Sequence, residues 1–153
     1  MVSCVGFYNL ENLFDTLIDP DTNKILQDDF TPKGTKQWTS KRYKEKLTRM
    51  AKVISELGTD VTPDGVAILG VSEIENRTVL EDLVKEAALK GRNYKVVHYD
   101  SPDRRGIDVG LIYNPAYFQV ESSRSISLRQ LDSTFYTRDQ LLVTGKMLSL
   151  IHI

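Results

Sequence analysis

The stretch VAILGVSEIEN, residues 66–76, decides the fold. Its first six residues, 66–71, form an uninterrupted apolar run, which is typical of a β-strand buried on both faces. The run ends at Ser72 and Glu73. In α/β sheets, ligands usually bind at the edge formed by the carboxyl ends of such strands. Glu73 is therefore the first candidate for a functional residue.

Helical patterns flank this strand on both sides. The spacing of apolar residues predicts a helix that is capped at residues 39–40 and ended by Gly58. After the strand, Thr78 and Glu81 fit a capping box for a second helix, which Gly91 would close. The central strand thus has a helix before it and a helix after it.

The remaining apolar segments predict further strands. They cover residues 2–10, 94–99, 107–113, 117–128 and 141–147. Helices come early and hairpins late, in the order β-α-β-α-β-β-β-β. This order favours an α/β (α+β) fold with mixed sheets over a doubly wound parallel sheet.

Composition and the start of the chain narrow the class of protein. A chain of 153 residues with 41% hydrophobic and 27% charged residues has ordinary globular composition. It contains no apolar run of the ~20 residues that span a bilayer, and MVSCVGFYNL has none of the features of a signal peptide. Cys4 is the single cysteine, which excludes an internal disulfide and a multi-cysteine zinc site. We interpret it as a buried small hydrophobe.

Charge is unevenly distributed, although the net charge is only −1. Residues 15–32 form an acidic segment rich in turn formers and are predicted to be a long loop. Residues 33–52 hold eight basic residues against one acidic residue, Glu45 (the eight are Lys33, Lys36, Lys41, Arg42, Lys44, Lys46, Arg49 and Lys52). This basic stretch could attract a polyanion or form the solvated side of a helix.

Two polar residues stand where apolar strands end. Glu73 is costly to desolvate unless it meets a positive partner, either Arg or Lys in a salt bridge or a divalent cation held by oxygen ligands. Asn9 interrupts the first strand near its end, and its amide needs hydrogen-bond partners. Those partners could be the local backbone or a bound phosphate.

Four segments in register resemble the endonuclease/exonuclease/phosphatase family, the group of pancreatic-type deoxyribonuclease, exonuclease III, sphingomyelinases and inositol polyphosphate phosphatases. They are FYNLENLFD (7–15), SEIEN (72–76), RRGIDVGLIYNP (104–115) and TRDQLLVTGK (137–146). Two more, FTPKGTKQW (30–38) and HYDSPDRRG (98–106), are similar to bacterial members. The resemblance implies a four-layered α/β/β/α sandwich with a metal–phosphate site at the upper edge of its two sheets.

The resemblance also implies roles for single residues. Glu73 would be the ligand of Mg²⁺ or Mn²⁺, and Asn9 the amide beside the scissile phosphate. Arg138 matches a position that often contacts substrate phosphate, with an ion pair to Asp139 or another acid as the alternative. Asp108 matches a recurrent polar position near the site, for which a structural hydrogen bond is the simpler interpretation.

Arg104 and Arg105 lie in a loop where contact with phosphate and simple solvation are both open. The activity implied by the resemblance is divalent-metal-dependent hydrolysis of phosphodiesters. A nuclease is favoured by the basic stretch, whose binding to nucleic acid would weaken steeply with salt. A phosphomonoesterase or phospholipase of the same family, and a non-catalytic module that binds phosphate or nucleic acid, are the alternatives. Relatives of this kind often look exported, so a periplasmic or secreted parent protein is an expectation.

Several motifs of the family are not found in this sequence. The later Asn-His, Asp-x-Asn and Asp-His segments do not occur, and neither His98 nor His152 matches them. His98, in the middle of a strand, is interpreted as a packing or surface residue. Residues 1–147 are therefore predicted to be the N-terminal part of the domain, truncated and inactive. Residues 148–153, LSLIHI, are interpreted as a non-native tail from a sequencing-library adapter, with a native short strand as the alternative.

A truncated sandwich leads to a prediction about solubility. One sheet and part of a second leave an apolar face and an open edge uncovered. We expect the 153 residues alone to be poorly soluble or partly molten. A sharp cooperative melt together with dispersed amide resonances in an NMR spectrum would show this expectation to be wrong.

Overall fold

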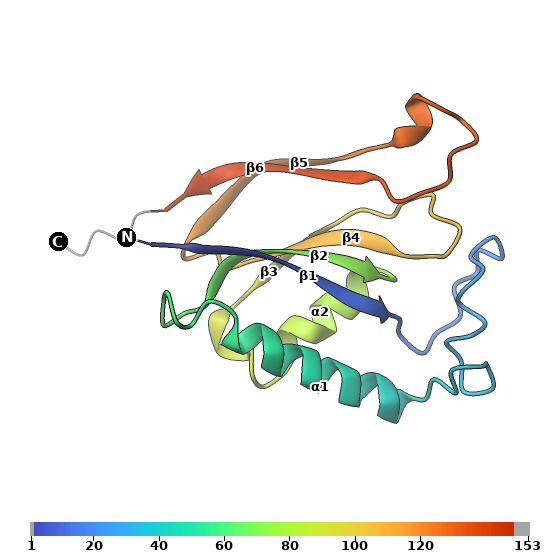
Figure 1. The fold of residues 1–153 in the computed structure, drawn as a ribbon, viewed down its shortest axis with the longest axis horizontal. Helices are drawn as coiled ribbons and strands as arrows, with labels where there is room; N and C mark the ends of the chain where they lie inside the picture. Colours follow the sequence, from blue (N-terminus) through green and yellow to red (C-terminus); the bar gives the residue numbers. More distant parts are fainter. Residues whose placement is uncertain (1, 149–153) are drawn as a thin grey trace.

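A computed structural model describes residues 2–148, which form an α/β fold with two sheets (Figure 1). All the predicted strands and both predicted helices are present. The elements are β1 (Cys4–Leu13), α1 (Ser40–Glu56), β2 (Val66–Ile74), α2 (Arg77–Lys85), η1 (Lys90–Arg92), β3 (Lys95–His98), β4 (Asp108–Tyr113), β5 (Phe118–Ile126), η2 (Leu128–Gln130) and β6 (Gln140–Met147). The interpretation of residues 149–153 as a tail lies outside the described residues.

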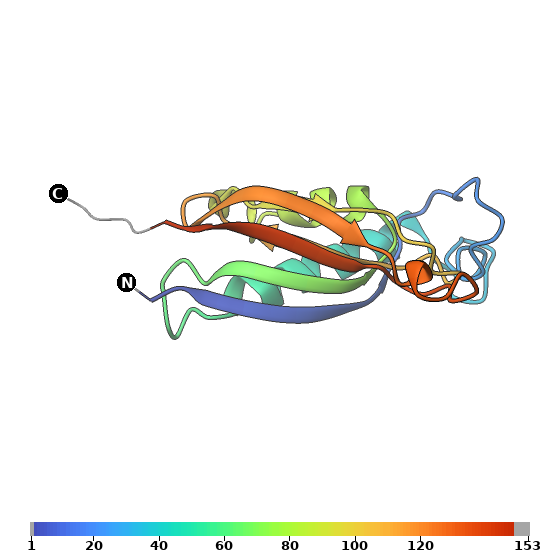
Figure 2. The ribbon, with the colours of Figure 1, turned by 90° about the horizontal axis from the view of Figure 1, so that it is seen from above.

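The larger sheet is mixed, as predicted. Its strand order is β1-β2-β4-β3, with β1 parallel to β2 and the other neighbours antiparallel. Helices α1 and α2 cover one face, and the β5–β6 hairpin lies over the other face (Figures 1 and 2). The described residues thus form three layers: the two helices, the larger sheet and the hairpin. The parallel pairing brings the carboxyl ends of β1 and β2 to the same edge.

The main core lies between the larger sheet and the two helices. Leu69 and Ile112 from the sheet meet Ile54 and Leu80 from the helices, and all four side chains are fully buried. Gly110 of β4 allows α2 to approach closely, because a Cβ atom there would lie 2.6 Å from the Leu80 side chain. Cys4 is half-buried and packs against this core.

The helix ends agree with prediction for α1 but not for α2. Thr39 caps α1 through a hydrogen bond from the backbone of Arg42. The cap of α2 is Asn76 instead of Thr78, since the Asn76 side chain accepts from the backbone N–H of Val79 (3.1 Å). The physical reason is that β2 runs directly into the helix, so an extended Asn at its end satisfies the first free N–H groups. Helix α2 also ends at Lys85, before the predicted terminator.

The long loop between β1 and α1 is held by a small aromatic core. Phe14 stacks on Phe30 with ring centroids 4.3 Å apart, and Trp38 packs edge-on against Phe30. The Trp38 indole also donates a hydrogen bond to the carbonyl oxygen of Phe14 (3.0 Å). Ile107, which precedes β4, completes this second cluster. The loop is thereby fixed beside the carboxyl ends of the strands, where the loops before β4 and β6 also lie (Figure 2).

Apolar side chains of β1 remain exposed on the face toward the hairpin. Phe7 is 70% exposed and Val5 is 65% exposed. Phe7 borders a cavity of about 650 Å³ between the two sheets, which Leu141 and Val143 of β6 also line. The truncation of the domain and the solubility of the chain stay predictions. No helix in the described part of the chain is long and apolar enough to cross a membrane.

Candidate functional site

Backbone irregularities mark the carboxyl ends of β1 and β2. The pairing of β1 with β2 shifts register between Asn9 and Leu13, and the pairing of β2 with β4 shifts between Ser72 and Ile74. Glu73 has a φ of 60° at the second irregularity. Left-handed backbone at such residues costs on the order of 1–3 kcal/mol and is concentrated at functional sites. Asn9 pairs with Ser72, so Asn9 and Glu73 occupy neighbouring positions on this edge.

The Glu73 carboxylate is half-buried and uncommitted. Among residues 2–148, no hydrogen bond and no ion pair within 4.0 Å engages it. Two cations lie near it: its charge offsets part of the lowering of the pKa of Lys46 by burial, and it adds to the raising of the pKa of Arg105, which is caused mainly by Asp103. The salt bridge that the sequence left open is thus not formed. The carboxylate is available to a ligand.

Asn9 is exposed and makes a local contact. Its Oδ1 accepts a hydrogen bond from the backbone N–H of Glu11 (2.7 Å). This is the strand-end capping that the sequence left open. The role of its amide beside a phosphate stays a prediction.

Lys46 of α1 stabilises the irregular end of β1. Its Nζ donates to the carbonyl oxygens of Glu11 (2.5 Å) and Asn12 (3.2 Å), both of which have left-handed backbone. Burial lowers the pKa of Lys46, and the carboxylates of Glu11 and Glu73 oppose that effect only in part. Lys46 is therefore a partly buried residue that holds the backbone of β1 at the site. The prediction that the basic stretch is the solvated side of a helix does not account for it.

Two predicted arginines converge on an acid that sequence reasoning missed. Asp103 is buried, and Arg105 binds it through Nε (3.0 Å) and Nη2 (2.6 Å). Arg138 lies 3.8 Å from the same carboxylate, whereas Asp139 accepts a hydrogen bond from Ser125 instead. Burial alone would raise the pKa of Asp103, but the hydrogen bonds from Arg105 outweigh it and the net pKa is lowered.

The cluster of Asp103, Arg105 and Arg138 faces the candidate site. The hydrogen bonds to Asp103 are the main cause of the raised pKa of Arg105, and the charge of Glu73 adds to it. Because Arg105 already neutralises the Asp103 carboxylate, the positive charge of Arg138 remains available to an anion. The sequence signal for Asp103 was its position two residues before Arg105, in a turn that ends at Gly106 with a φ of 72°.

Asp108 is buried and makes structural hydrogen bonds. Its Oδ1 accepts from the backbone N–H (2.9 Å) and the hydroxyl (2.5 Å) of Ser101. Its Oδ2 lies 3.0 Å from Nε2 of His98, whose side chain is only 3% exposed. His98 is therefore paired with a buried acid, whereas the sequence predicted only a packing or surface residue.

His98, Asp100 and Asp108 form a possible metal-binding group. One ligand atom of each residue lies within 4.8 Å of those of the other two. However, both oxygens of Asp108 are already hydrogen bonded. The ammonium of Lys24 is also close: its hydrogen bond with Asp19 is the main cause of its raised pKa, and the charges of Asp108 and Asp100 add to that effect. These contacts would compete with a cation for Asp108.

Two buried acids, Glu75 and Asp15, tie the long loop to β2. The Glu75 carboxylate accepts a hydrogen bond from the backbone N–H of Asp15 (2.7 Å), and Asp15 accepts from the Asn76 side chain (3.0 Å). Burial raises the pKa of Glu75 to about 7. Glu75 follows Glu73 by two residues, but its contacts are structural and it is buried away from solvent.

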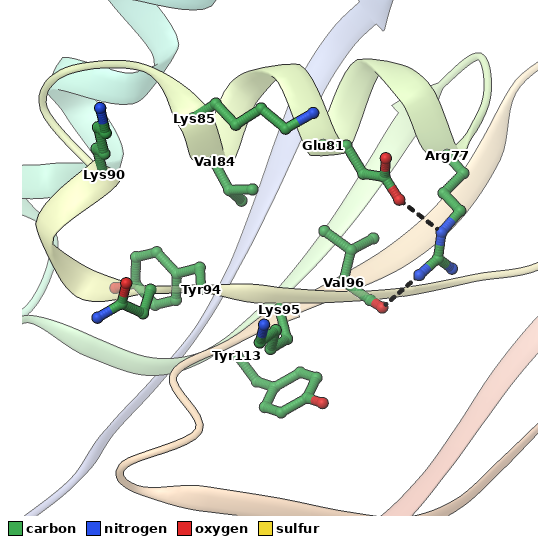
Figure 3. Close-up of a pocket in the computed structure, with 10 residues that line it drawn as sticks. Arg77, Glu81, Val84, Lys85, Lys90, Tyr94, Lys95, Val96 and Tyr113 are labelled. Atoms are coloured by element: carbon green, nitrogen blue, oxygen red, sulfur yellow. Dashed lines mark hydrogen bonds and ion pairs between the residues drawn. The ribbon is translucent and has the colours of Figure 1, made fainter.

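Another cavity, of about 490 Å³, lies between α2 and β3 (Figure 3). Arg77 is occupied there by Glu81 (2.8 Å) and by the carbonyl oxygen of Val96 (3.3 Å). Lys85 extends along the helix and Lys90 points away from the strands, so their ammonium groups do not converge (Figure 3). We assign no chemistry to this cavity.

The fold and the site together define a class of protein. A mixed sheet carries a free carboxylate at its strand ends, with arginines beside it, as enzymes that act on phosphate esters require. The chain matches the profile of the endonuclease/exonuclease/phosphatase family over residues 4–150, and it belongs to this family. No curated protein and no solved structure matches it. Membership suggests phosphodiester or phosphoester hydrolase activity, typically dependent on a divalent metal.

Proposed function

We propose that the protein is a divalent-metal-dependent phosphodiester hydrolase and, within that class, a nuclease of the deoxyribonuclease and exonuclease III branch from a bacterium. The observation that carries the proposal is the free Glu73 carboxylate beside Arg105. Its neighbours on the strand-end edge are polar, and its left-handed backbone is held by the surrounding sheet.

The donor set fits a hard cation. Glu73 offers carboxylate oxygens without a competing ion pair, and the Oδ1 of Asn9 on the neighbouring strand, which accepts from the backbone N–H of Glu11, has a second lone pair to offer. Oxygen ligands of this kind suit Mg²⁺ and Mn²⁺, which need only one or two protein ligands in addition to water and phosphate. The cation, when bound, neutralises charge on the phosphate oxygens. His98 and Asp100 are the less suitable alternative ligands because Asp108, which joins them, is already satisfied.

The remaining residues have roles in holding the phosphate. Arg105, oriented by Asp103, and Arg138 would bind non-bridging oxygens, which match the guanidinium fork. The Asn9 amide would orient the attacking group. Asp108 shapes the preceding loop through Ser101 and takes no part in the reaction.

A general base is not among the residues described. The one Asp–His pair in residues 2–148, Asp108 with His98, is buried, with side chains only 5% and 3% exposed. We therefore propose that residues 2–148 bind the cation and the phosphate without turning substrate over. A phosphomonoesterase or phospholipase of the same family, or a phosphate-binding module, would share this half of the site.

Metal titration tests the proposal. We expect the chain to bind Mn²⁺ at one saturable site by isothermal titration calorimetry, and thymidylyl-thymidine to bind more tightly once Mn²⁺ is present. Neither plasmid DNA nor bis(p-nitrophenyl) phosphate should be cleaved. Absence of saturable Mn²⁺ binding would overturn the proposal. Cleavage would show that the chain is active, and tighter binding of thymidine 5′-monophosphate than of the dinucleotide would favour a phosphomonoesterase.

A further inference from the structure

A cavity of about 690 Å³ adjoins the candidate site. Three loops line it: residues 21–25, residues 101–104 and the connection between β5 and β6. The first two loops are tied together by a hydrogen bond from the backbone of Ile25 to the carbonyl oxygen of Arg104 (2.7 Å). Asp103, which orients the phosphate-binding arginines of the proposed function, also lines this cavity. The cavity and the site are therefore contiguous.

Two guanidinium groups share one aromatic ring in this cavity. The Cζ atoms of Arg104 and Arg129 lie 4.2 Å and 4.4 Å from the ring centroid of Tyr136. Arg129 is further fixed by a hydrogen bond from Nε to the carbonyl oxygen of Ser133 (3.2 Å). Cation–π contacts of this kind are worth about 0.5–1 kcal/mol at exposed sites. They hold two positive charges close together, where the charges repel each other.

Neither guanidinium is neutralised. In the part of the chain that the structure describes, no carboxylate lies within 4.0 Å of Arg104 or Arg129, whereas Lys24 pairs with Asp19. The carboxylate of Asp103 is already taken up by Arg105. Asp21 also lines the cavity, so Arg104 and Arg129 together leave an excess of one positive charge there, carried by two arginines of the kind that bind phosphate.

We propose that this cavity binds a second phosphate group of an oligonucleotide, one that neighbours the phosphodiester held at Glu73. The inference rests on the proposed function for its first phosphate. A simple monoester has no second phosphate to place there, and the charged lining does not suit an acyl chain. Stacked arginine and tyrosine side chains are also the groups on which single-stranded nucleic acids dock. This lining favours a polynucleotide strand over an inositol polyphosphate as the source of the second phosphate.

The test compares binding of labelled single-stranded hexathymidylate by fluorescence anisotropy, in Ca²⁺ so that nothing is cleaved. For Arg129→Ala and Arg104→Ala we expect roughly tenfold weaker binding and a salt slope lower by ~0.7, the value for one lost contact with a single strand. Arg124→Ala is the matched control, because Arg124 is exposed on β5 and does not line the cavity. It should bind like the wild type, and thymidylyl-thymidine, with one phosphodiester, should bind all variants equally.

The outcomes separate this inference from the proposed function. If wild type binds no hexathymidylate, if the cavity variants bind it like wild type, or if Arg124→Ala weakens it as much as Arg129→Ala, the inference is overturned. Saturable Mn²⁺ binding in that case leaves the proposed function standing. If Mn²⁺ does not bind but the cavity variants alone lose hexathymidylate, the proposed function fails and the cavity stands as a site for nucleic acid.

Discussion

Glu73→Gln is expected to weaken Mn²⁺ binding by at least ~100-fold, about 2.7 kcal/mol of binding free energy. The substitution keeps the size of the side chain and its hydrogen-bonding oxygen but removes the charge. Glu73 makes no ion pair within the described residues, so the loss should appear in metal affinity and scarcely in folding. In any longer form of the protein that turns substrate over, the same change should slow hydrolysis by on the order of 10²-fold or more.

Two control variants make this expectation specific. Glu45→Gln removes an equal charge from an exposed position on α1 and should leave Mn²⁺ affinity unchanged. Asp100→Asn removes the exposed member of the alternative ligand group. If Asp100→Asn loses Mn²⁺ while Glu73→Gln retains it, the cation belongs to the His98 group and the assignment of Glu73 is wrong.

Local patterns were sufficient to predict the elements of the fold. The apolar run 66–71 predicted a buried strand, and the strand β2 carries it to the sheet edge where Glu73 lies. The early helices and late hairpin predicted a mixed sheet, because consecutive apolar segments without helices between them pair as antiparallel neighbours. The cap of α2 was predicted at Thr78 but is Asn76, because β2 ends in extended backbone at Asn76 directly before the helix.

The partners of the site residues could not be predicted from local sequence patterns. Arg138 meets Asp103 across 35 positions, and that contact depends on how the β5–β6 connection folds over the loop before β4. His98 could not be paired with Asp108 without the β3–β4 register, which places His98 opposite Gly110. Lys46 belonged to a basic stretch, and nothing in its sequence context separated it from its exposed neighbours. Contacts of this kind are set by tertiary structure and not by local propensity.

The second large effect is expected for Asp108→Ala, which should lower the free energy of unfolding by about 3 kcal/mol. Asp108 is buried and is the acceptor for both Ser101 groups and the partner of His98. Its removal leaves a buried imidazole and a backbone N–H without partners, and each such group costs ~1–3 kcal/mol. For a chain of this size the melting temperature should fall by roughly 6–12 °C.

The same variant decides whether Asp108 is structural or a metal ligand. Urea unfolding in EDTA, followed by the fluorescence of Trp38, should show the full loss, since hydrogen bonds to Ser101 need no cation. Asp100→Ala, exposed in the same loop, should stay within ~0.5 kcal/mol of wild type. Trypsin should also cut faster after Arg104 in Asp108→Ala, because the loop that carries Arg104 and Arg105 loses its anchor at Ser101. If Asp108→Ala matches wild type in both measurements in EDTA and differs only when Mn²⁺ is added, Asp108 binds the cation and the structural interpretation fails.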